Sequence, residues 1–438
     1  MDITPANRAS AVAGSRVAAT ALRWTGYVLF FLMLVVPTTY QPIKGVLLAT
    51  VLGGIAVGML RRGRTGLHRH VVMLAAAFAA LGLAYVLRGY VRGAPGALST
   101  FNVYVTWPLV YTALAAGASR PEVLRGLVRT LVVAANAIAL YSLIYVLWEA
   151  GYWPDALYYA IDQGQAIGFY GSYIEFNLYS ITSLLFMTPF LVAALLVFPA
   201  SGGPVSRRTL WLSLALNTVT VLLTGRRALL VLVPVAPVLA LWLRSWLTAD
   251  RKRESRRLVA RALAGAITLG IVLVVAATSL GALSPGGFVE MVGTGFQFDT
   301  DPVAMLRRDQ FNALVAGWLE HPILGSGHGA PAAVIRSAET PWSYELSYVA
   351  LLYHTGLLGV TAYAAGALWI GYMSYLIARR GWSEAPSLVA TLVGTASFMI
   401  ANATNPYLQK YDYIWVIFLP VAFVNCYLVT WKHAPHDR

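Results

Sequence analysis

Long apolar stretches separated by short polar loops recur along almost the whole chain. Most of them hold roughly 17 to 25 residues, the length that a helix needs to cross about 30 Å of hydrocarbon. A backbone in lipid must satisfy its own hydrogen bonds, and these stretches are much longer than the strands of a membrane barrel. The pattern therefore predicts an all-α polytopic membrane protein with about 12 transmembrane helices. The expected spans are 22–38, 43–60, 71–87, 99–117, 128–148, 178–198, 209–224, 228–247, 262–283, 346–378, 387–404 and 413–431.

The tenth stretch, 346–378, is longer than one perpendicular crossing requires. It contains the sequence "GLLG" at 356–359. Because glycines are a common cause of helix kinks, we expect a short interfacial helix before this point and a full span after it.

The composition agrees with a membrane protein, since 58% of the 438 residues are hydrophobic and 11% are charged. We expect a single integral membrane domain over 1–438. The polar first twenty residues lead into a full apolar segment without the features of a cleaved signal peptide, so the first span is expected to stay as an anchor. The single cysteine, Cys426, excludes an intramolecular disulfide.

The net charge of +14 follows membrane topology, because the basic residues fall in loops between spans and not on a soluble face. We therefore expect no nucleic-acid partner. With both termini cytoplasmic, 23 Lys and Arg residues lie inside and 9 outside, whereas 6 Asp and Glu lie inside and 12 outside. This asymmetry is typical of the positive-inside rule and supports an even number of spans.

Two outer segments, 149–177 and 284–345, are unusually long, and loops of this length are often functional. The second precedes helix 10 and contains a stretch that predicts a helix over 301–322, with Asp301 as N-cap and Pro302 at the first helical position. We expect 284–345 to be a periplasmic loop that carries part of an active site.

Most of the cations expected on the outer side are arginines, although Lys and Arg usually lie on the inner side of a membrane. They are Arg88, Arg92, Arg226, Arg227, Arg307, Arg308 and Arg336. Arg226 and Arg227 occupy a tight turn between the seventh and eighth spans, where a charge needs a partner or a water-filled cavity. Snorkelling to lipid headgroups is one explanation. A tandem pair that faces a second pair at 307–308 favours a bound anion.

Phosphate suits these arginines, because the planar guanidinium stays charged and offers paired donors that match phosphate oxygens. A diphosphate would satisfy several of them together. In a partly dry site the same contacts would stabilise the charge that grows on a departing diphosphate.

Three segments resemble the O-antigen ligase and polymerase superfamily of bacterial inner membranes. "TGRRALLVL" (224–232) is similar to that family's arginine turn, with Arg226 at the characteristic position. "RRDQFNALVAGWLEHPILGSGHGA" (307–330) is similar to its arginine-led helix that ends in Pro-x-x-Gly-x-Gly, with Arg308 or Arg307 at the basic position. "ELSYVALLYHTGLLG" (345–359) is similar to a segment with an aromatic residue, here Tyr348, and a final Gly-x-x-Gly.

The third segment departs from the ligase pattern, because Glu345 occupies the place where ligases carry histidine. A carboxylate there can accept the proton of an attacking sugar hydroxyl. Alternatively, Glu345 is a structural residue near a helix start, favoured by the helix dipole. His354 is another candidate base or a packing residue. Asn402, Asn405 and Tyr407 can line the same cavity, although Pro406 also makes their segment a helix break.

The resemblance implies a helical fold related to GT-C glycosyltransferases, with a periplasmic active site and no metal or other cofactor. His328 in "GSGHGA" lacks neighbours at ligand spacing, which also argues against a metal site. Glu345, Arg226 and Arg308 are the expected catalytic residues. The expected substrate-binding residues are Arg227, Arg307, Arg336, Tyr348, His354 and Arg88.

The expected function is that of a polysaccharide polymerase in the bacterial inner membrane. It would transfer glycan repeat units from an undecaprenyl-diphosphate-linked oligosaccharide to a glycan acceptor, with a chain-length regulator as a further partner. One alternative is an O-antigen ligase that transfers the glycan to lipid A-core. Another is a secondary transporter for an anionic solute, although the two related halves that are common in transporters are missing.

The charge asymmetry predicts that both termini and residues 244–261 are cytoplasmic and that 284–345 is periplasmic. Single cysteines at residues 255 and 330, in a chain whose Cys426 is replaced by serine, can be labelled with a membrane-impermeant maleimide in spheroplasts. Residue 330 should react directly and residue 255 only after lysis. Labelling of both from the same side would contradict this topology.

Overall fold

The computed structural model describes residues 5–170, 173–199, 201–224, 226–247, 275 and 302–430. The predicted ninth span, 262–283, and the first part of the loop 284–345 lie outside this part of the chain, apart from residue 275. The structure is mostly helical, with one short hairpin.

Helices coincide with the eleven other predicted spans. The helices are α1 (Pro5–Val35), α2 (Gln41–Arg62), α3 (Arg69–Val91), α4 (Ala97–Phe101), the π-helix η1 (Asn102–Thr106), α5 (Trp107–Gly117), α6 (Pro121–Glu149), α7 (Ile181–Val197), α8 (Arg207–Leu223), α9 (Arg227–Arg244), α12 (Pro302–Glu320), α13 (Ser347–Arg379), α14 (Ala385–Asn402) and α15 (Trp415–Thr430). The predicted fourth span comprises α4, η1 and α5. Among the described residues, 7 helices are long and apolar enough to cross a membrane. The chain is therefore a membrane-embedded helical protein, and the count of twelve spans stays a prediction.

The centre of the bundle is α7, which packs against α14, α9 and α8. Its sequence, "ITSLLFMTPFLVAALLV", is apolar on every side, and a helix of this kind is stable only when neighbours cover all its faces. Its side chains are accordingly buried almost throughout, with Phe186 and Phe190 among the largest. The helices α1 and α2 lie at the periphery, since only 11% of each span is buried.

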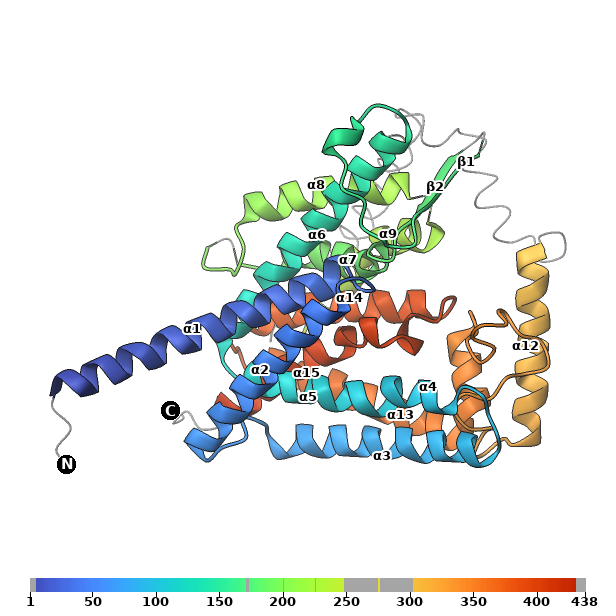
Figure 1. The fold of residues 1–438 in the computed structure, drawn as a ribbon, viewed down its shortest axis with the longest axis horizontal. Coiled ribbons are helices and arrows are strands. Elements are labelled where there is room, and N and C mark those ends of the chain that lie inside the picture. The colour runs from blue at the N-terminus through green and yellow to red at the C-terminus, as the bar shows by residue number, and fades with distance from the viewer. Residues whose placement is uncertain are drawn as a thin grey trace.

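The two ends of the bundle differ (Figure 1). The first turn of α1 and the last turn of α15 lie at one end, while α12 and the hairpin lie at the other. The helix α12 crosses this second end instead of running along the bundle. It confirms the helix predicted over 301–322, with Pro302 in its first turn; Asp301, the predicted N-cap, lies outside the described residues.

An antiparallel hairpin in the outer segment 149–177 is a feature that the hydrophobic pattern did not predict. Its strands are β1 (Ala166–Tyr170) and β2 (Tyr173–Asn177), and Ala166 pairs with Asn177. Three short 3-10 helices complete the described elements: η2 (Asp155–Leu157), η3 (Tyr407–Gln409) and η4 (Tyr411–Tyr413).

The break predicted at "GLLG" is confirmed at its first glycine. Gly356 has φ 60° and ψ −170°, a combination that only glycine adopts readily. The backbone amides of Leu357 and Leu358 leave the helix pattern and donate to the carbonyls of Pro322 and Ile323, at 2.9 and 3.1 Å. The break thus fastens α13 to the end of the α12 segment.

The glycine-rich turn after α12 completes this attachment. Gly325, Gly327 and Gly329 all have positive φ. The amide of Ser326 donates to the Tyr353 carbonyl and that of Gly327 to the His354 carbonyl, at 2.9 and 2.8 Å. The "GSGHGA" sequence is therefore a tight turn packed on the first half of α13.

We predict that Gly356→Ala destabilises the protein by about 1–3 kcal/mol from backbone strain alone. An added Cβ would also lie 2.3 Å from the Ile323 carbonyl oxygen. Thermal unfolding of the purified protein in detergent should show a lower melting temperature. The matched control is Gly371→Ala on the same helix, where a Cβ meets no atom within 4 Å. An unchanged melting temperature for Gly356→Ala would show that the break is not required.

Candidate functional site

A carboxylate held by two arginines lies at the end of the bundle that α12 crosses. The Oε2 atom of Glu345 accepts from the Arg307 Nε at 2.5 Å, and its Oε1 lies 3.1 Å from the Arg336 Nη2. The Glu345 side chain is only 14% exposed, while each arginine side chain is 42% exposed. Both carboxylate oxygens are thus used, and the arginines keep open sides that a further anion can reach.

Arg226 joins this group from the turn between α8 and α9. Its Nη2 donates to the Oδ1 of Asn177, the last residue of β2. It also forms a hydrogen bond with the side chain of Tyr407 in η3. Burial raises the pKa of the Tyr407 hydroxyl, while Arg226 lowers it; Glu345 and Arg336 also act on it. Tyr407 therefore lies close to Arg226, Glu345 and Arg336. We call Arg226, Arg307, Arg336 and Glu345 the arginine cluster.

The arginine cluster carries an excess of positive charge. Three guanidinium groups against one carboxylate leave a net charge of plus two. Lys410 adds a positive charge near Arg336. Desolvation lowers the pKa of Lys410, the nearby Asp412 raises it, and Arg336 lowers it further. Its ammonium lies 5.5 Å from the centre of the Tyr179 ring. An arrangement of this kind favours an anion with two or more negative charges.

Local structure explains why these side chains meet. The turn from α8 to α9 leaves Arg226 in an extended conformation just before the first turn of α9. The helix α12 carries Arg307, and the attachment at Gly356 fixes the start of α13 directly after Glu345. The Glu345 side chain bonds to arginines, and no side-chain cap is present at the start of α13. The alternative in which Glu345 is a structural residue near the helix start, favoured by the helix dipole, stays open.

A large apolar cavity begins two residues beyond Glu345 along the chain, at Ser347, although no member of the arginine cluster lines it. It has a volume of about 430 Å³ and lies among η1, α13, α14 and α15. Its polar lining includes Ser347, two residues after Glu345, and Gln409, two residues after Tyr407. Most of the remaining lining is apolar, for example Leu351, Ile370 and Met399. A polar head at the arginine cluster could therefore continue into an apolar tail in this cavity.

The structure brings some of the predicted site residues together and places the others elsewhere. The structure brings Arg226, Arg307, Arg336 and Glu345 together. Tyr348 lines the apolar cavity, and its hydroxyl donates to the Met399 carbonyl at 2.6 Å. Arg308 follows Arg307 on α12 and is exposed. For Arg227 the structure describes the backbone, at the first position of α9, but not the side chain.

His354 and Arg88 contact the glycine-rich turn instead. The Nε2 of the buried His354 lies 3.0 Å from the Ala330 carbonyl oxygen, and its ring packs near those of Tyr344 and Tyr353. The Arg88 Nε donates to the Gly325 carbonyl at 2.8 Å. His354 and Arg88 thus support the glycine-rich turn, and their contacts do not place them in the arginine cluster.

Sequence reasoning missed Asn177 and Lys410 as members of the site. Asn177 ends a hairpin that was not predicted, although the Gly-Ser pair between two apolar runs, at 171–172, is a recognised hairpin signal. Lys410 belongs to the nine Lys and Arg residues expected outside, but it lies in no recognised motif. In the described part of the chain, no group of three His, Cys, Asp or Glu side chains could hold a metal, and the absence of a metal requirement stays a prediction.

We predict that the arginine cluster binds inorganic pyrophosphate. Arg226→Ala and Arg336→Ala should each weaken binding by roughly ten- to a hundredfold, because a hydrogen bond to a charged group contributes about 1.5–3 kcal/mol. Isothermal titration calorimetry of the purified protein measures this. Arg92→Ala, which removes an exposed arginine just after α3, is the control and should bind normally. Equal affinity in all variants would exclude the cluster as the anion site.

Comparison with known proteins adds no relative to this description. No family model, no curated protein and no solved structure matched the chain.

Proposed function

We propose that this protein is a membrane glycosyltransferase of the polysaccharide polymerase kind. It transfers glycan repeat units from an undecaprenyl-diphosphate donor to a sugar hydroxyl on the periplasmic face of the bacterial inner membrane. The observation that supports this proposal best is a cluster of three arginines and one carboxylate, with a large apolar cavity that begins two residues beyond Glu345 along the chain.

The charge of the arginine cluster matches the head of such a donor. A diphosphate that is esterified at both ends carries two negative charges, which equals the excess positive charge of the cluster. Guanidinium groups bind phosphate oxygens in pairs, and they remain charged at any physiological pH. Arg226, Arg307 and Arg336 come from separate segments, so they can contact the diphosphate from different sides.

The apolar cavity suits the rest of the donor. A polyprenyl chain needs an apolar path that begins next to its diphosphate. The cavity lined by Leu351, Ile370 and Met399 begins near Ser347, close in the chain to Glu345. An anionic solute of a transporter would need the arginines but not this apolar space.

Glu345 would act in two ways during the reaction. Without donor, it is the counter-ion of Arg307 and Arg336. When the diphosphate takes these arginines, both carboxylate oxygens of Glu345 become free to accept a hydrogen bond from another group. The carboxylate would then accept the proton of the acceptor hydroxyl as the hydroxyl oxygen attacks the anomeric carbon. The bond from that carbon to the diphosphate oxygen breaks, and the diphosphate leaves with the electron pair and one further negative charge, which the arginines stabilise.

The choice of a polymerase over a ligase rests on Glu345. The ligases that the sequence resembles carry histidine at this position. A carboxylate that is already paired with two arginines performs a different electrostatic task from an imidazole, because it also offsets part of their positive charge.

A reconstituted assay tests this function. Purified protein in nanodiscs, supplied with a lipid-linked oligosaccharide and no ion gradient, should produce longer glycans, which gel electrophoresis resolves. Glu345→Gln should reduce turnover by roughly 10²- to 10⁴-fold, since it keeps the size of the side chain but removes the base. It should bind pyrophosphate more tightly than the unaltered protein, because the competing carboxylate charge is gone. Glu345→His should retain partial activity, because imidazole is also a base near neutral pH.

Two outcomes would contradict the proposal. Glycan lengthening by Glu345→Gln at the unaltered rate would remove Glu345 from proton transfer. Absence of any lengthening by the unaltered protein, together with gradient-driven uptake of an anion into proteoliposomes, would favour the transporter. Arg92→Ala again serves as a control that should remain active.

A further inference from the structure

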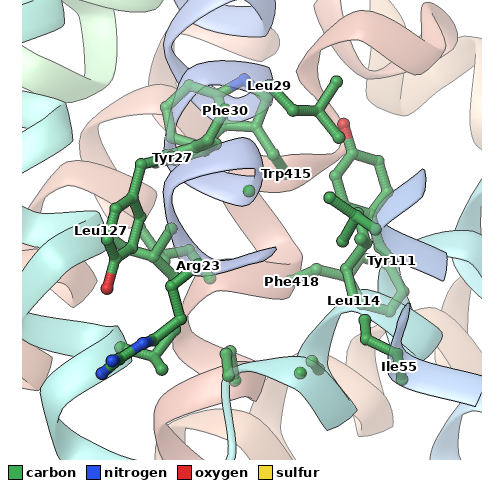
Figure 2. Close-up of a pocket in the computed structure, with 18 of the residues that line it drawn as sticks. Arg23, Tyr27, Leu29, Phe30, Ile55, Tyr111, Leu114, Leu127, Trp415 and Phe418 are labelled. Carbon is green, nitrogen blue, oxygen red and sulfur yellow. The ribbon is translucent and has the colours of Figure 1, made fainter. Parts of the chain in front are cut away.

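A second cavity lies in the opposite half of the bundle, away from α12. It has a volume of about 160 Å³ and is bounded by α1, α2, α5, α6 and α15. Figure 2 shows Arg23 and Tyr27 of α1 on one side of it and Tyr111, Leu114 and Ile55 on the other. Among its lining residues Arg23 is the only charged one. The following inference does not depend on the proposed function.

The length of the pocket matches one leaflet of a bilayer. Its wall on α1 extends from Leu22 to Met33. At a rise of about 1.5 Å per residue this is roughly 16 Å, about half of the 30 Å hydrocarbon thickness. The rest of the lining is predominantly apolar, with Leu29, Phe30 and Phe418 as examples. The length and chemistry of this wall suit an acyl chain that lies along it, with part of the chain in the pocket and the rest in the open space beside α1.

The pocket opens towards the surroundings of the bundle. Several of its lining residues are partly exposed, including Leu22, Gly26, Phe30 and Leu127. Gly26 shows how much space is present, because a Cβ added there would meet no atom within 4 Å. Since α1 is largely unburied along its span, lipid can reach the space between α1 and the bundle from the side.

The polar end of the pocket is basic. Arg23 is exposed, and its guanidinium donates to the Thr20 hydroxyl at 3.1 Å, which leaves donors for another group. Arg23, Arg129 and Glu122 all act electrostatically on the Tyr27 hydroxyl. Two arginines against one glutamate leave a net positive charge where the pocket meets the membrane surface. A phosphate of a negatively charged lipid is attracted to such a surface.

The neighbouring helix α6 leaves room for the Tyr27 ring. A Cβ at Gly126 of α6 would lie 2.1 Å from the Cζ of the Tyr27 ring, so glycine at this position allows the ring to rest on α6. The Tyr27 ring thereby forms a side wall next to Arg23 (Figure 2).

We propose that this pocket binds one acyl chain of an anionic glycerophospholipid of the bilayer, with the lipid phosphate at Arg23. The chain fills the space behind α1 and joins this peripheral helix to α5, α6 and α15. The predicted topology places Arg23 at the cytoplasmic surface, so the lipid comes from the inner leaflet.

The test compares lipid binding to the purified full-length protein by native mass spectrometry. The probes are dioleoyl phosphatidylglycerol and dioleoyl phosphatidylcholine, which have the same chains and differ in net charge. The unaltered protein should retain phosphatidylglycerol preferentially. Arg23→Ala should lose this preference, with binding of phosphatidylglycerol weakened on the order of tenfold. Gly26→Leu should abolish the binding of both lipids at this site, because its side chain fills the pocket.

The matched control is Gly58→Leu on α2. A Cβ at Gly58 also meets nothing within 4 Å, but Gly58 does not line the pocket. This variant should bind phosphatidylglycerol like the unaltered protein. Normal lipid binding by Gly26→Leu would overturn the proposal. It would also be overturned if the unaltered protein retained the two lipids equally, so that Arg23→Ala had no preference to lose. Each variant can be checked for folding by its melting temperature in detergent.

Discussion

The ion pairs of Glu345 with Arg307 and Arg336 connect α12, the segment before α13 and the residue just ahead of α13 through charge. Arginines held close together repel one another, and each one loses part of its hydration when neighbouring segments pack around it. A single carboxylate with both oxygens engaged compensates two of them. Without it, α12 and the loop that carries Arg336 would bring uncompensated charge to the start of α13. The carboxylate of Glu345 is therefore an internal counter-ion that stabilises the packing of these segments.

This arrangement relates stability to function. Because Glu345 already pairs with two of the arginines, internal contacts must be given up when an anion binds to them, so part of the binding energy of the anion is used for the exchange. In the proposed reaction, the group that is released is the one that accepts the proton. The same carboxylate would compensate the arginines at rest and accept a proton during turnover, and the two roles would exclude each other in time.

Backbone geometry fixes the position of this carboxylate. The glycine-rich turn and the break at Gly356 lock the end of the α12 segment onto the first half of α13 through main-chain hydrogen bonds. Side chains such as His354 and Arg88 bond to the carbonyls of that turn. The glycines of the motif are thus required for close packing of backbone on backbone, whereas the arginines and Glu345 beside them carry the charge.

The sequence by itself determined the membrane class, the positions of most helices, the helix α12 and the break at Gly356. Each of these depends on local properties: apolar length, the conformational range of glycine, or the fixed φ of proline. From the charge distribution, the sequence also predicted that the seven outer arginines lie on the same side of the protein. The sequence could not decide between Arg307 and Arg308, which are adjacent. It also could not identify Asn177 as the partner of Arg226, 49 residues away, or pair Arg307 with Glu345 across 38 residues. Such contacts depend on how α9, α12 and the hairpin approach one another, and only tertiary packing decides which face of each element meets its neighbours.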